Sequence, residues 1–304
     1  MARIAYLGPQ GTFTEAAMLQ LADAAPGGSE FEPVACDSSG AALEAVRMGT
    51  ADYACVPIEN SIEGSVLPTM DSLSWGSGVQ IFAEHTLDVA FTIVVRPGVT
   101  AETVSTVAAF PVAAAQVRRW LAERLPHATV VPAISNAGAA QQVSEGLADA
   151  GVSTALAALR WELDSLAEGV VDEPNARTRF VLVGRPGPPP PRTGADRTSV
   201  VLRLRNEPGA LVSAMTEFSI RGIDLTRIES RPTRTELGTY IFYLDCVGHI
   251  DDAPVAEALK ALHRRVAEVR YLGSWPTGVA AGAAPPDTDE ATQWLAGLRE
   301  GGRA

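Results

Sequence analysis

The stretch Asp52-Tyr-Ala-Cys-Val-Pro-Ile-Glu-Asn-Ser-Ile-Glu-Gly-Ser-Val66 decides the fold of the first half of this chain. Its apolar part, residues 53–58, is typical of a short buried strand. Three polar residues follow at the mouth of that strand, ahead of a helix-like run over residues 66–75: Glu59, Asn60 and Ser61. Ligands of open α/β sheets bind beyond the carboxyl ends of the strands, so we expect these side chains to line a ligand site. The alternative is an ordinary strand-to-helix turn with solvated polar residues.

Strand-like and helix-like runs alternate ahead of this stretch. We expect a strand over residues 3–7, a helix from Thr12, a second strand over residues 31–36 and a second helix up to Met48. Thr12 and Glu15 have the spacing of a capping box, which favours a helix start at this point. The alternation predicts a mostly parallel sheet that is covered by helices on both faces.

A second lobe is indicated by residues 79–95, which are rich in strand formers and long enough to cross between two lobes. The alternation then restarts with an expected strand over residues 103–110 and a helix over residues 111–125. An expected strand over residues 177–183 returns to the first lobe. Two α/β lobes joined by crossing strands are the arrangement of type II periplasmic binding proteins. The two hinges are expected near residues 76–95 and 165–178.

A proline-rich segment divides the chain. Residues 185–196 contain five prolines and predict a stiff linker that belongs to no packed element. Beyond it, the order strand–helix–strand–strand–helix–strand over residues 197–276 is the ferredoxin-like βαββαβ arrangement. We therefore expect a bilobed α/β domain over residues 1–184, the linker, a smaller second domain, and a tail over residues 277–304 in which a short helix forms after Asp287.

Composition excludes several classes of function. The formal net charge of -12 argues against nucleic acid and anionic membrane as partners, although a local arginine cluster can still bind an anionic substrate. The N-terminus starts a strand without the apolar core of a signal peptide, and no apolar run approaches the ~20 residues of a membrane span. Three scattered cysteines lack metal spacing and are expected to be reduced: Cys36, Cys55 and Cys246. We expect a cytoplasmic protein without a metal site.

Two motifs carry a family resemblance. The stretch 52–66 resembles one signature of the prephenate dehydratases, and Asn175-Ala-Arg-Thr-Arg-Phe180 resembles a second. The resemblance extends over residues 3–275 and implies a lyase of L-phenylalanine biosynthesis that removes CO2 and the ring hydroxyl of prephenate to give phenylpyruvate. The family's reaction is strongly downhill because the product gains an aromatic ring. The resemblance therefore implies that the enzyme needs no cofactor. It needs a donor near the departing hydroxyl and groups that hold the substrate.

The resemblance implies the catalytic residues Thr178, Asn60 and Gln116. A threonine hydroxyl is too weak an acid to lose its proton unaided, so we expect either a hydrogen bond that strengthens as the substrate hydroxyl leaves or a relay from a neighbour. Asn60 and Gln116 match positions that act on the same group. The resemblance implies four further residues in substrate binding: Glu59, Ser61, Arg179 and Phe180. Arg179 is expected to clamp a substrate carboxylate in a bidentate manner. Phe180 is equally consistent with a core position.

One departure from the family pattern precedes Pro111. The family usually has Ser-His there, whereas this chain has Ala109-Phe110. A hydroxyl that supports the substrate is therefore missing from the second lobe, and Ser135 is a candidate to replace it.

The second domain carries two more motifs, Asn206-Glu-Pro-Gly-Ala-Leu-Val212 and Ile228-Glu-Ser-Arg-Pro232. The first places a turn before a helix start, where free N–H groups suit a carboxylate and Gly209 permits close approach. Both resemble the effector motifs of ACT domains, which implies that L-phenylalanine binds and inhibits between paired ACT domains of a homodimer or homotetramer. The alternative is a domain that only dimerises. The implied effector residues are Asn206, Pro208, Gly209, Ala210, Leu211, Val212, Glu229 and Ser230.

The resulting hypothesis is a cofactor-independent prephenate dehydratase with a phenylalanine-sensing ACT domain. Two alternatives stay open: an arogenate dehydratase, and a non-catalytic amino-acid sensor. Joint retention of Thr178, Asn60 and Gln116 argues against the sensor, since a sensor has no use for a donor to a leaving group.

Overall fold

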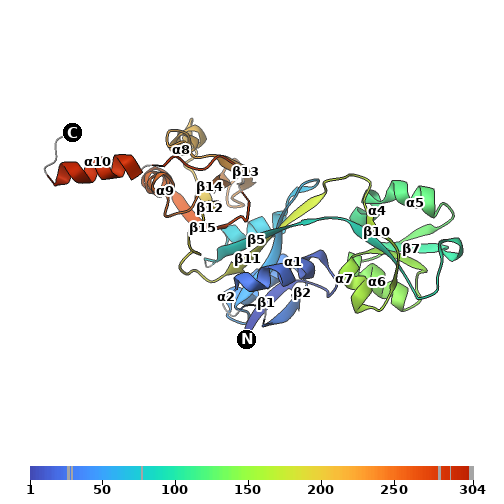
Figure 1. Cartoon of the computed structure of the whole chain (residues 1–304). Helices are drawn as coiled ribbons and strands as arrows, with labels where there is room; N and C mark the ends of the chain where they lie inside the picture. The colour runs from blue at the N-terminus through green and yellow to red at the C-terminus, as the bar shows by residue number, and fades with distance from the viewer. Residues whose placement is uncertain (26–27, 29, 77, 280–281, 288, 301–304) are drawn as a thin grey trace. The chain divides into compact units, whose positions relative to one another are not determined.

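The computed structural model describes residues 1–25, 28, 30–76, 78–279, 282–287 and 289–300, and it divides into two compact units (Figure 1). The first unit contains residues 1–79 and 84–185, and the second contains residues 80–83 together with the chain from residue 186 onward. The sequence predicts a boundary near residue 185, and the structural division falls at the same position. In addition, residues 80–83 fall in the second unit. Residues 80–83 open a long strand that continues into the first unit.

The first lobe is built on a six-stranded sheet with the strand order β2-β1-β3-β11-β5, to which β4 adds beside β3. Its strands are β1 (Ala2–Leu7), β2 (Phe31–Cys36), β3 (Tyr53–Asn60), β4 (Gly64–Ser65), β5 (Gln80–Asp88) and β11 (Arg177–Gly184). Its helices are α1 (Phe13–Leu21), η1 (Ala22–Ala24), α2 (Ser39–Arg47) and α3 (Leu67–Ser74). Strand β1 runs parallel to β2 and β3, whereas β11 lies antiparallel to β3.

Strand β3 differs from its sequence-based expectation at one end. The apolar run is buried as expected, with Ala54 and Val56 fully inside. However, Glu59 and Asn60 belong to the strand and do not lie beyond it. The prediction that both follow the strand was therefore wrong. The reason is tertiary, because β11 offers these two residues an antiparallel partner and the hydrogen-bond ladder continues through them.

The second lobe holds a five-stranded sheet with the order β10-β6-β9-β7-β8. Its strands are β6 (Phe91–Val95), β7 (Thr106–Ala109), β8 (Thr129–Pro132), β9 (Ala150–Ser153) and β10 (Asp164–Val170). Its helices are η2 (Ala101–Thr103), α4 (Pro111–Gln116), α5 (Arg118–Arg124), α6 (Asn136–Ser144) and α7 (Ala155–Arg160). The helix expected over residues 111–125 is thus two helices, and β10 occupies residues that the sequence assigned to a hinge.

Two segments connect the lobes and pair with each other. Val89, between β5 and β6, donates its N–H to the carbonyl of Ala176, between β10 and β11, at 2.7 Å. The lobes also meet at the end of β1, where Thr154 Oγ1 donates to the Gly11 carbonyl at 2.6 Å. Two α/β lobes with a double connection confirm the expected bilobed architecture of periplasmic binding proteins.

The start of α1 shows how one residue serves both local and tertiary structure. Thr12 Oγ1 accepts the N–H of Glu15 at 3.3 Å, which confirms Thr12 as the N-cap. The Glu15 carboxylate accepts from the Gly11 N–H and pairs with Arg160 of α7. The capping-box acid is therefore used to join the lobes, because a buried carboxylate is stabilised most by a cation.

The second unit confirms the ferredoxin-like order. It contains β12 (Asp196–Arg203), α8 (Ala210–Ser219), β13 (Leu225–Pro232), β14 (Tyr240–Val247), α9 (Ala253–Arg265) and β15 (Glu268–Pro276). The four strands form an antiparallel sheet in the order β13-β14-β12-β15. Val200, Leu244 and Phe218 are at the centre of the core between this sheet and the two helices.

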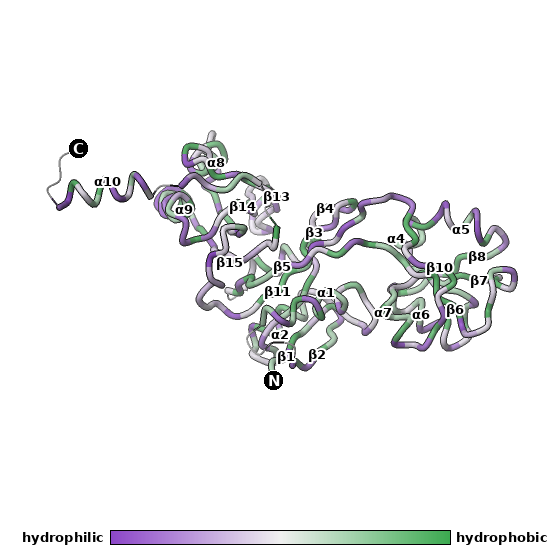
Figure 2. The backbone as a smooth tube through the Cα atoms, viewed as in Figure 1, coloured by the Kyte–Doolittle hydropathy of each residue, from purple (hydrophilic) through white to green (hydrophobic). Residues whose placement is uncertain are grey.

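The tail contains the expected short helix, α10 (Asp289–Arg299). Trp294, Leu295 and Leu298 are exposed on it, and hydrophobic positions interrupt hydrophilic ones along its course (Figure 2). Residues 280, 281, 288 and 301–304 of the predicted tail lie outside the described residues. Among the helices that the structure describes, none combines the length and apolar character needed to cross a membrane.

Candidate functional site

Thr178 and Asn60 are brought together across β11 and β3. They are register partners in the antiparallel pair, and Asn60 Nδ2 donates to Thr178 Oγ1 at 2.9 Å. The amide orientation is fixed because Asn60 Oδ1 accepts the N–H groups of Ile62 and Glu63 at 2.8 and 2.9 Å. A hydroxyl has one proton and two lone pairs, so this bond uses an acceptor position and leaves the Thr178 proton for donation elsewhere.

Arg179 and Glu59 form the next register pair along the same two strands. Arg179 Nη2 lies 2.9 Å from Glu59 Oε2, and Arg179 Nη1 lies 3.1 Å from Glu84 Oε2 on β5. The side chains of Arg179 and Glu84 are 8% and 7% exposed. A guanidinium already bound to carboxylates on both neighbouring strands is suited to fixing the local strand geometry. This observation favours a supporting role for Arg179 over the expected substrate clamp.

Glu84 is a member of this network that the sequence interpretation missed. It lies in β5, where the residues on either side include the buried Ala83. An acidic residue within a strand-rich apolar run is a signal for a buried ion pair, because an isolated buried carboxylate is strongly destabilising. The sequence contains that signal, but it does not show that Arg179 is the residue that pairs with Glu84.

Ser61 and Phe180 also have defined protein partners. Ser61 Oγ donates to the Asn175 carbonyl at 3.1 Å and accepts the Arg177 N–H at 2.9 Å, so it ties the end of β3 to the start of β11. Phe180 is 2% exposed and lies among the core residues. These contacts favour structural roles for both side chains next to Thr178.

Gln116 lies in the second lobe, at the last position of α4. Its Oε1 atom is buried and, in the described structure, has no hydrogen-bond partner. The same is true of Asn136 Oδ1 at the start of α6. Buried side-chain acceptors are normally satisfied, so an unpartnered amide oxygen is a candidate contact for a bound ligand. The structure does not bring Gln116 into a hydrogen bond with Asn60 or Thr178.

The departure at Ala109-Phe110 has a local structural outcome. Phe110 occupies the N-cap position of α4, and its ring packs against the core of the second lobe. Ser135, the candidate replacement hydroxyl, is the N-cap of α6, and its Oγ accepts the Gly138 N–H at 2.9 Å. Ser135 Oγ therefore caps its own helix through an acceptor position, which leaves its proton for donation elsewhere.

Burial keeps two nearby ionisable side chains neutral. Desolvation raises the pKa of the Cys55 thiol on β3 well above its ordinary value. Desolvation, with a smaller contribution from the Glu15 charge, raises the pKa of Tyr6 on β1 to about 12. Both groups therefore stay protonated at neutral pH and behave as core residues.

The second motif region is shaped by its backbone. Gly209 is the N-cap of α8 with φ = 81°, and no side chain of the described residues caps this helix start. Asn206, Ala210 and Leu211 line one cavity of about 140 Å³ together with Tyr240 and Phe242. Ser230 on β13 is the register partner of Phe242, and Glu229 is that of Tyr243. Asn206, Ala210 and Leu211 therefore lie at the turn before α8, and Ser230 shares a face of the sheet with Phe242. Glu229, the register partner of the buried Tyr243, lies on the opposite face.

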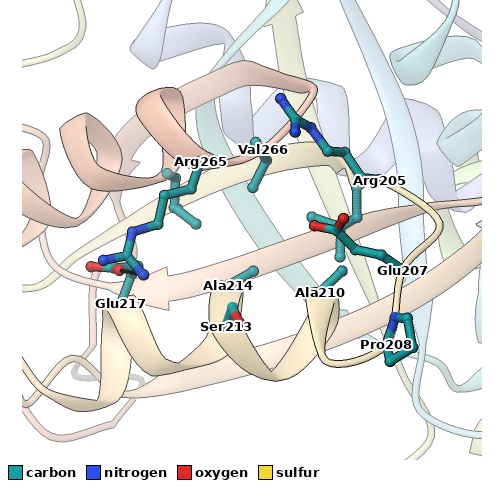
Figure 3. Close-up of a pocket in the computed structure, with 11 residues that line it drawn as sticks. Arg205, Glu207, Pro208, Ala210, Ser213, Ala214, Glu217, Arg265 and Val266 are labelled. Carbon is teal, nitrogen blue, oxygen red and sulfur yellow. Dashed lines mark ion pairs between the residues drawn. The ribbon is translucent and has the colours of Figure 1, made fainter.

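A second cavity, of about 210 Å³, lies along α8 and is lined by residues of α8, α9 and the segment before α8 (Figure 3). Arg205, Glu207 and Pro208 lie at its end near the start of α8. At the opposite end, Arg265 Nη1 pairs with Glu217 Oε1 at 3.1 Å. The two cavities share Arg205, Glu207 and Ala210 among their lining residues, on either side of Pro208 and Gly209 in the sequence.

A bilobed α/β domain with polar side chains on neighbouring strands, followed by a ferredoxin-like domain, defines the class as a two-lobed ligand-binding domain with a second, smaller domain attached. A prephenate dehydratase family model matches residues 4–188, and an ACT domain model matches residues 198–264. The chain belongs to the prephenate dehydratase family, whose members are lyases, and it carries an ACT domain. The resemblance inferred from the two sequence motifs is confirmed.

Relatives with this name match along the whole chain. A prephenate dehydratase of Mycolicibacterium smegmatis is 74% identical over 99% of this chain and 99% of its own length. The structure of an Arthrobacter aurescens prephenate dehydratase in complex with L-Phe is 40% identical, with a TM-score of 0.87, and covers 98% of this chain. A third protein, GqqA, described as a novel type of quorum quenching acylase, is 30% identical over 90% of this chain with a TM-score of 0.78.

Proposed function

We propose that this protein converts prephenate to phenylpyruvate, CO2 and water, and that L-phenylalanine inhibits it by binding to the ACT domain. The observation that carries the catalytic part is the bond from Asn60 Nδ2 to Thr178 Oγ1, because it orients the threonine as a donor. As the ring carboxylate leaves as CO2, its bonding electrons enter the ring and the ring hydroxyl departs. The Thr178 hydroxyl donates a hydrogen bond to that departing oxygen, and the Asn60 N–H stabilises the charge that develops on Thr178. One proton from solvent, taken up directly or relayed through Thr178, completes the water molecule and leaves Thr178 protonated.

In the proposal, Arg179 and Gln116 position the groups that take part in this chemistry. Arg179, with Glu59 and Glu84, holds the strand that presents Thr178. Gln116 offers an amide from the second lobe, so closure of the lobes places it against the bound substrate. The reaction is unimolecular in substrate and gains aromatic stabilisation, so orientation and hydrogen bonding supply the catalysis that it needs.

Phenylalanine regulation is supported by the turn at Gly209 and by the name of the Arthrobacter structure, which contains L-Phe. An uncapped helix N-terminus suits the carboxylate of an amino acid. We also propose that ACT domains pair in a homodimer or homotetramer. Three large apolar side chains of the ACT domain are exposed in the single chain and are available for such pairing: Val212, Ile228 and Tyr240.

An acylase is the alternative from another reaction class, favoured by the similarity to GqqA. A threonine nucleophile needs a group that accepts its proton, whereas the amide of Asn60 donates to Thr178. The local geometry therefore favours the dehydratase. Arogenate, which differs from prephenate by an amino group in place of the keto oxygen, is the alternative substrate within the family.

The test follows formation of phenylpyruvate by ultraviolet absorbance, with and without L-phenylalanine. Turnover of prephenate that L-phenylalanine suppresses supports both parts of the proposal, and turnover without suppression contradicts the regulatory part. If prephenate is untouched, conversion of arogenate identifies the alternative substrate. Release of a free amine from an N-acylated substrate, without action on either, identifies an acylase.

A further inference from the structure

The break between α4 and α5 determines where Gln116 lies. The sequence predicts one helix over residues 111–125, yet α4 ends at Gln116 and α5 starts at Arg118. Val117 between them has φ = -124° and ψ = 14°, which is outside the helical region. The residues on both sides of this point are good helix formers, so their propensity does not explain the break.

Asp172 explains it from a distant part of the chain. Its Oδ2 accepts the Arg119 N–H at 2.7 Å, and its Oδ1 accepts the Trp120 N–H at 3.3 Å. These are N–H groups of the first turn of α5, so Asp172 does the work of an N-cap although it is 53 residues from Arg119. Its side chain is 10% exposed, and its negative charge also suits the N-terminal end of the helix dipole.

The backbone of Asp172 holds the other side of the break. Its N–H donates to the Gln116 carbonyl at 2.7 Å, and its own carbonyl accepts from the Arg119 guanidinium. One residue therefore satisfies the last turn of α4 and the first turn of α5 together. Without Asp172, the Gln116 carbonyl and the Arg119 and Trp120 N–H groups would lose these partners, and the end of α4 would no longer be tied to this segment.

Asp172 lies on the segment that leads directly into the strand of Thr178. That segment is anchored in the first lobe, because Ser61 Oγ donates to the Asn175 carbonyl and the Ser61 N–H donates to the Arg177 carbonyl at 2.8 Å. Strand β11 begins at Arg177. A short stretch of chain thus connects the backbone of Gln116 in one lobe to Thr178 in the other.

We propose that Asp172 is a positioning residue for the reaction: it fixes the end of α4 so that the Gln116 amide meets the substrate at Thr178. The inference rests on the proposed function. Because Gln116 Oε1 has no partner within the described residues, the place of this amide depends on where its backbone is held. A displacement of about 1 Å in a catalytic group is enough to cost on the order of 100-fold in rate.

The test measures kcat and KM for Asp172→Ala and Asp172→Asn with prephenate. We expect Asp172→Ala to lower kcat about tenfold with a smaller change in KM, because the amide is misplaced in the transition state. Asp172→Asn retains a good capping group, so it is expected to keep kcat within about threefold of the wild type. Ser38→Ala is the matched control, because it removes the cap of α2, where Ser38 Oγ accepts the Ala41 N–H at 3.1 Å. Its kcat should be unchanged.

A double-mutant cycle separates positioning from general destabilisation. On a Gln116→Ala background, Asp172→Ala should change kcat by less than about twofold, because the amide that it positions is already absent. An equal loss in both backgrounds overturns the proposal, and so does wild-type kcat in Asp172→Ala. Asp172→Ser, with one acceptor oxygen in place of two, repeats the cycle if the alanine variant does not fold. A wild-type protein that does not act on prephenate overturns the proposed function, and the inference with it. If the wild type is active and the effects of the two substitutions on kcat simply add, the inference alone is overturned.

Discussion

The strands that we propose as the active site and the turn that we propose as the effector site differ in what shapes them. At the strands, ligand binding in the proposal depends on side chains that reach across β3 and β11, such as Asn60 and Thr178. At the turn before α8, it depends on backbone conformation, because Gly209 has φ = 81° and the helix start is uncapped by any described side chain. The first region therefore tolerates few changes of side chain, and the second tolerates few changes of backbone freedom.

The two regions are also supported differently. Arg179 links carboxylates on both neighbouring strands, so the catalytic strand is rigidly held from within its sheet. The turn at Gly209 is held mainly by short-range backbone bonds, including Ala210 N–H to the Glu207 carbonyl at 3.2 Å. A turn of this kind can adjust to a ligand at low energetic cost, which suits regulation. Substitutions in the two regions should therefore differ in whether they change turnover or inhibition.

Removal of the donor at the strands should have the largest effect. Thr178→Ala is expected to lower kcat by about 100-fold or more, because the departing hydroxyl loses its hydrogen-bond donor. The melting temperature should change little, since the removed group is small and partly exposed. Steady-state kinetics and thermal unfolding check both. Thr178→Ser keeps a hydroxyl and serves as the control, and an alanine variant with full activity would contradict the mechanism.

The two ends of the Asn60 amide allow a sharper test. Asn60→Asp keeps acceptor oxygens for the N–H groups of Ile62 and Glu63 but lacks the Nδ2 donor to Thr178. We expect about a tenfold loss of kcat, which corresponds to one hydrogen bond of about 1.4 kcal/mol, with the fold retained. Asn60→Ala removes both functions and should also lower the melting temperature. Equal activity of the aspartate variant and the wild type would show that the donor is not used.

The regulatory turn should respond to a change of backbone freedom. Gly209→Leu is expected to weaken inhibition by L-phenylalanine several-fold while turnover stays within about twofold, because a side chain at positive φ costs roughly 1–2 kcal/mol and shifts the turn. Inhibition curves at fixed prephenate measure this. Gly98→Leu imposes the same strain in the second lobe, at φ = 83°, and should leave inhibition intact. Undiminished inhibition in Gly209→Leu would place the effector elsewhere.

A carboxylate outside both regions should change stability alone. The backbone N–H of Ser105 and the contacts of Thr106 hold the pKa of Asp149 below its ordinary value. A depressed pKa contributes stability that is complete above the ordinary aspartate range and is lost as pH falls through the folded value. Since the side chain is 33% exposed, we expect Asp149→Asn to lower the melting temperature by only about 2 °C at pH 7. The difference should shrink as pH falls through that value, and calorimetry at pH 7 and at a series of lower pH values checks it.

Much of the fold could be predicted from local sequence because the relevant interactions are local. The cap at Thr12, the glycine at the start of α8 and the alternating strands and helices all depend on residues a few positions apart. The proline-rich segment likewise marks the boundary between β11 and β12 from composition alone. The motifs around Asn60 and Thr178 were enough to identify the family.

The tertiary structure decided how those residues act. Asn60 and Thr178 are 118 positions apart, and only the register of β3 with β11 makes them partners. The same register pairs Arg179 with Glu59, so a residue expected to bind substrate is held by its own sheet. Asp172 ends a helix that its own sequence would continue. Residue propensity and motif spacing reflect only the conformational preference of a segment by itself. These contacts instead form between segments that are distant in the sequence, through backbone hydrogen bonds and ion pairs that only the folded chain brings together.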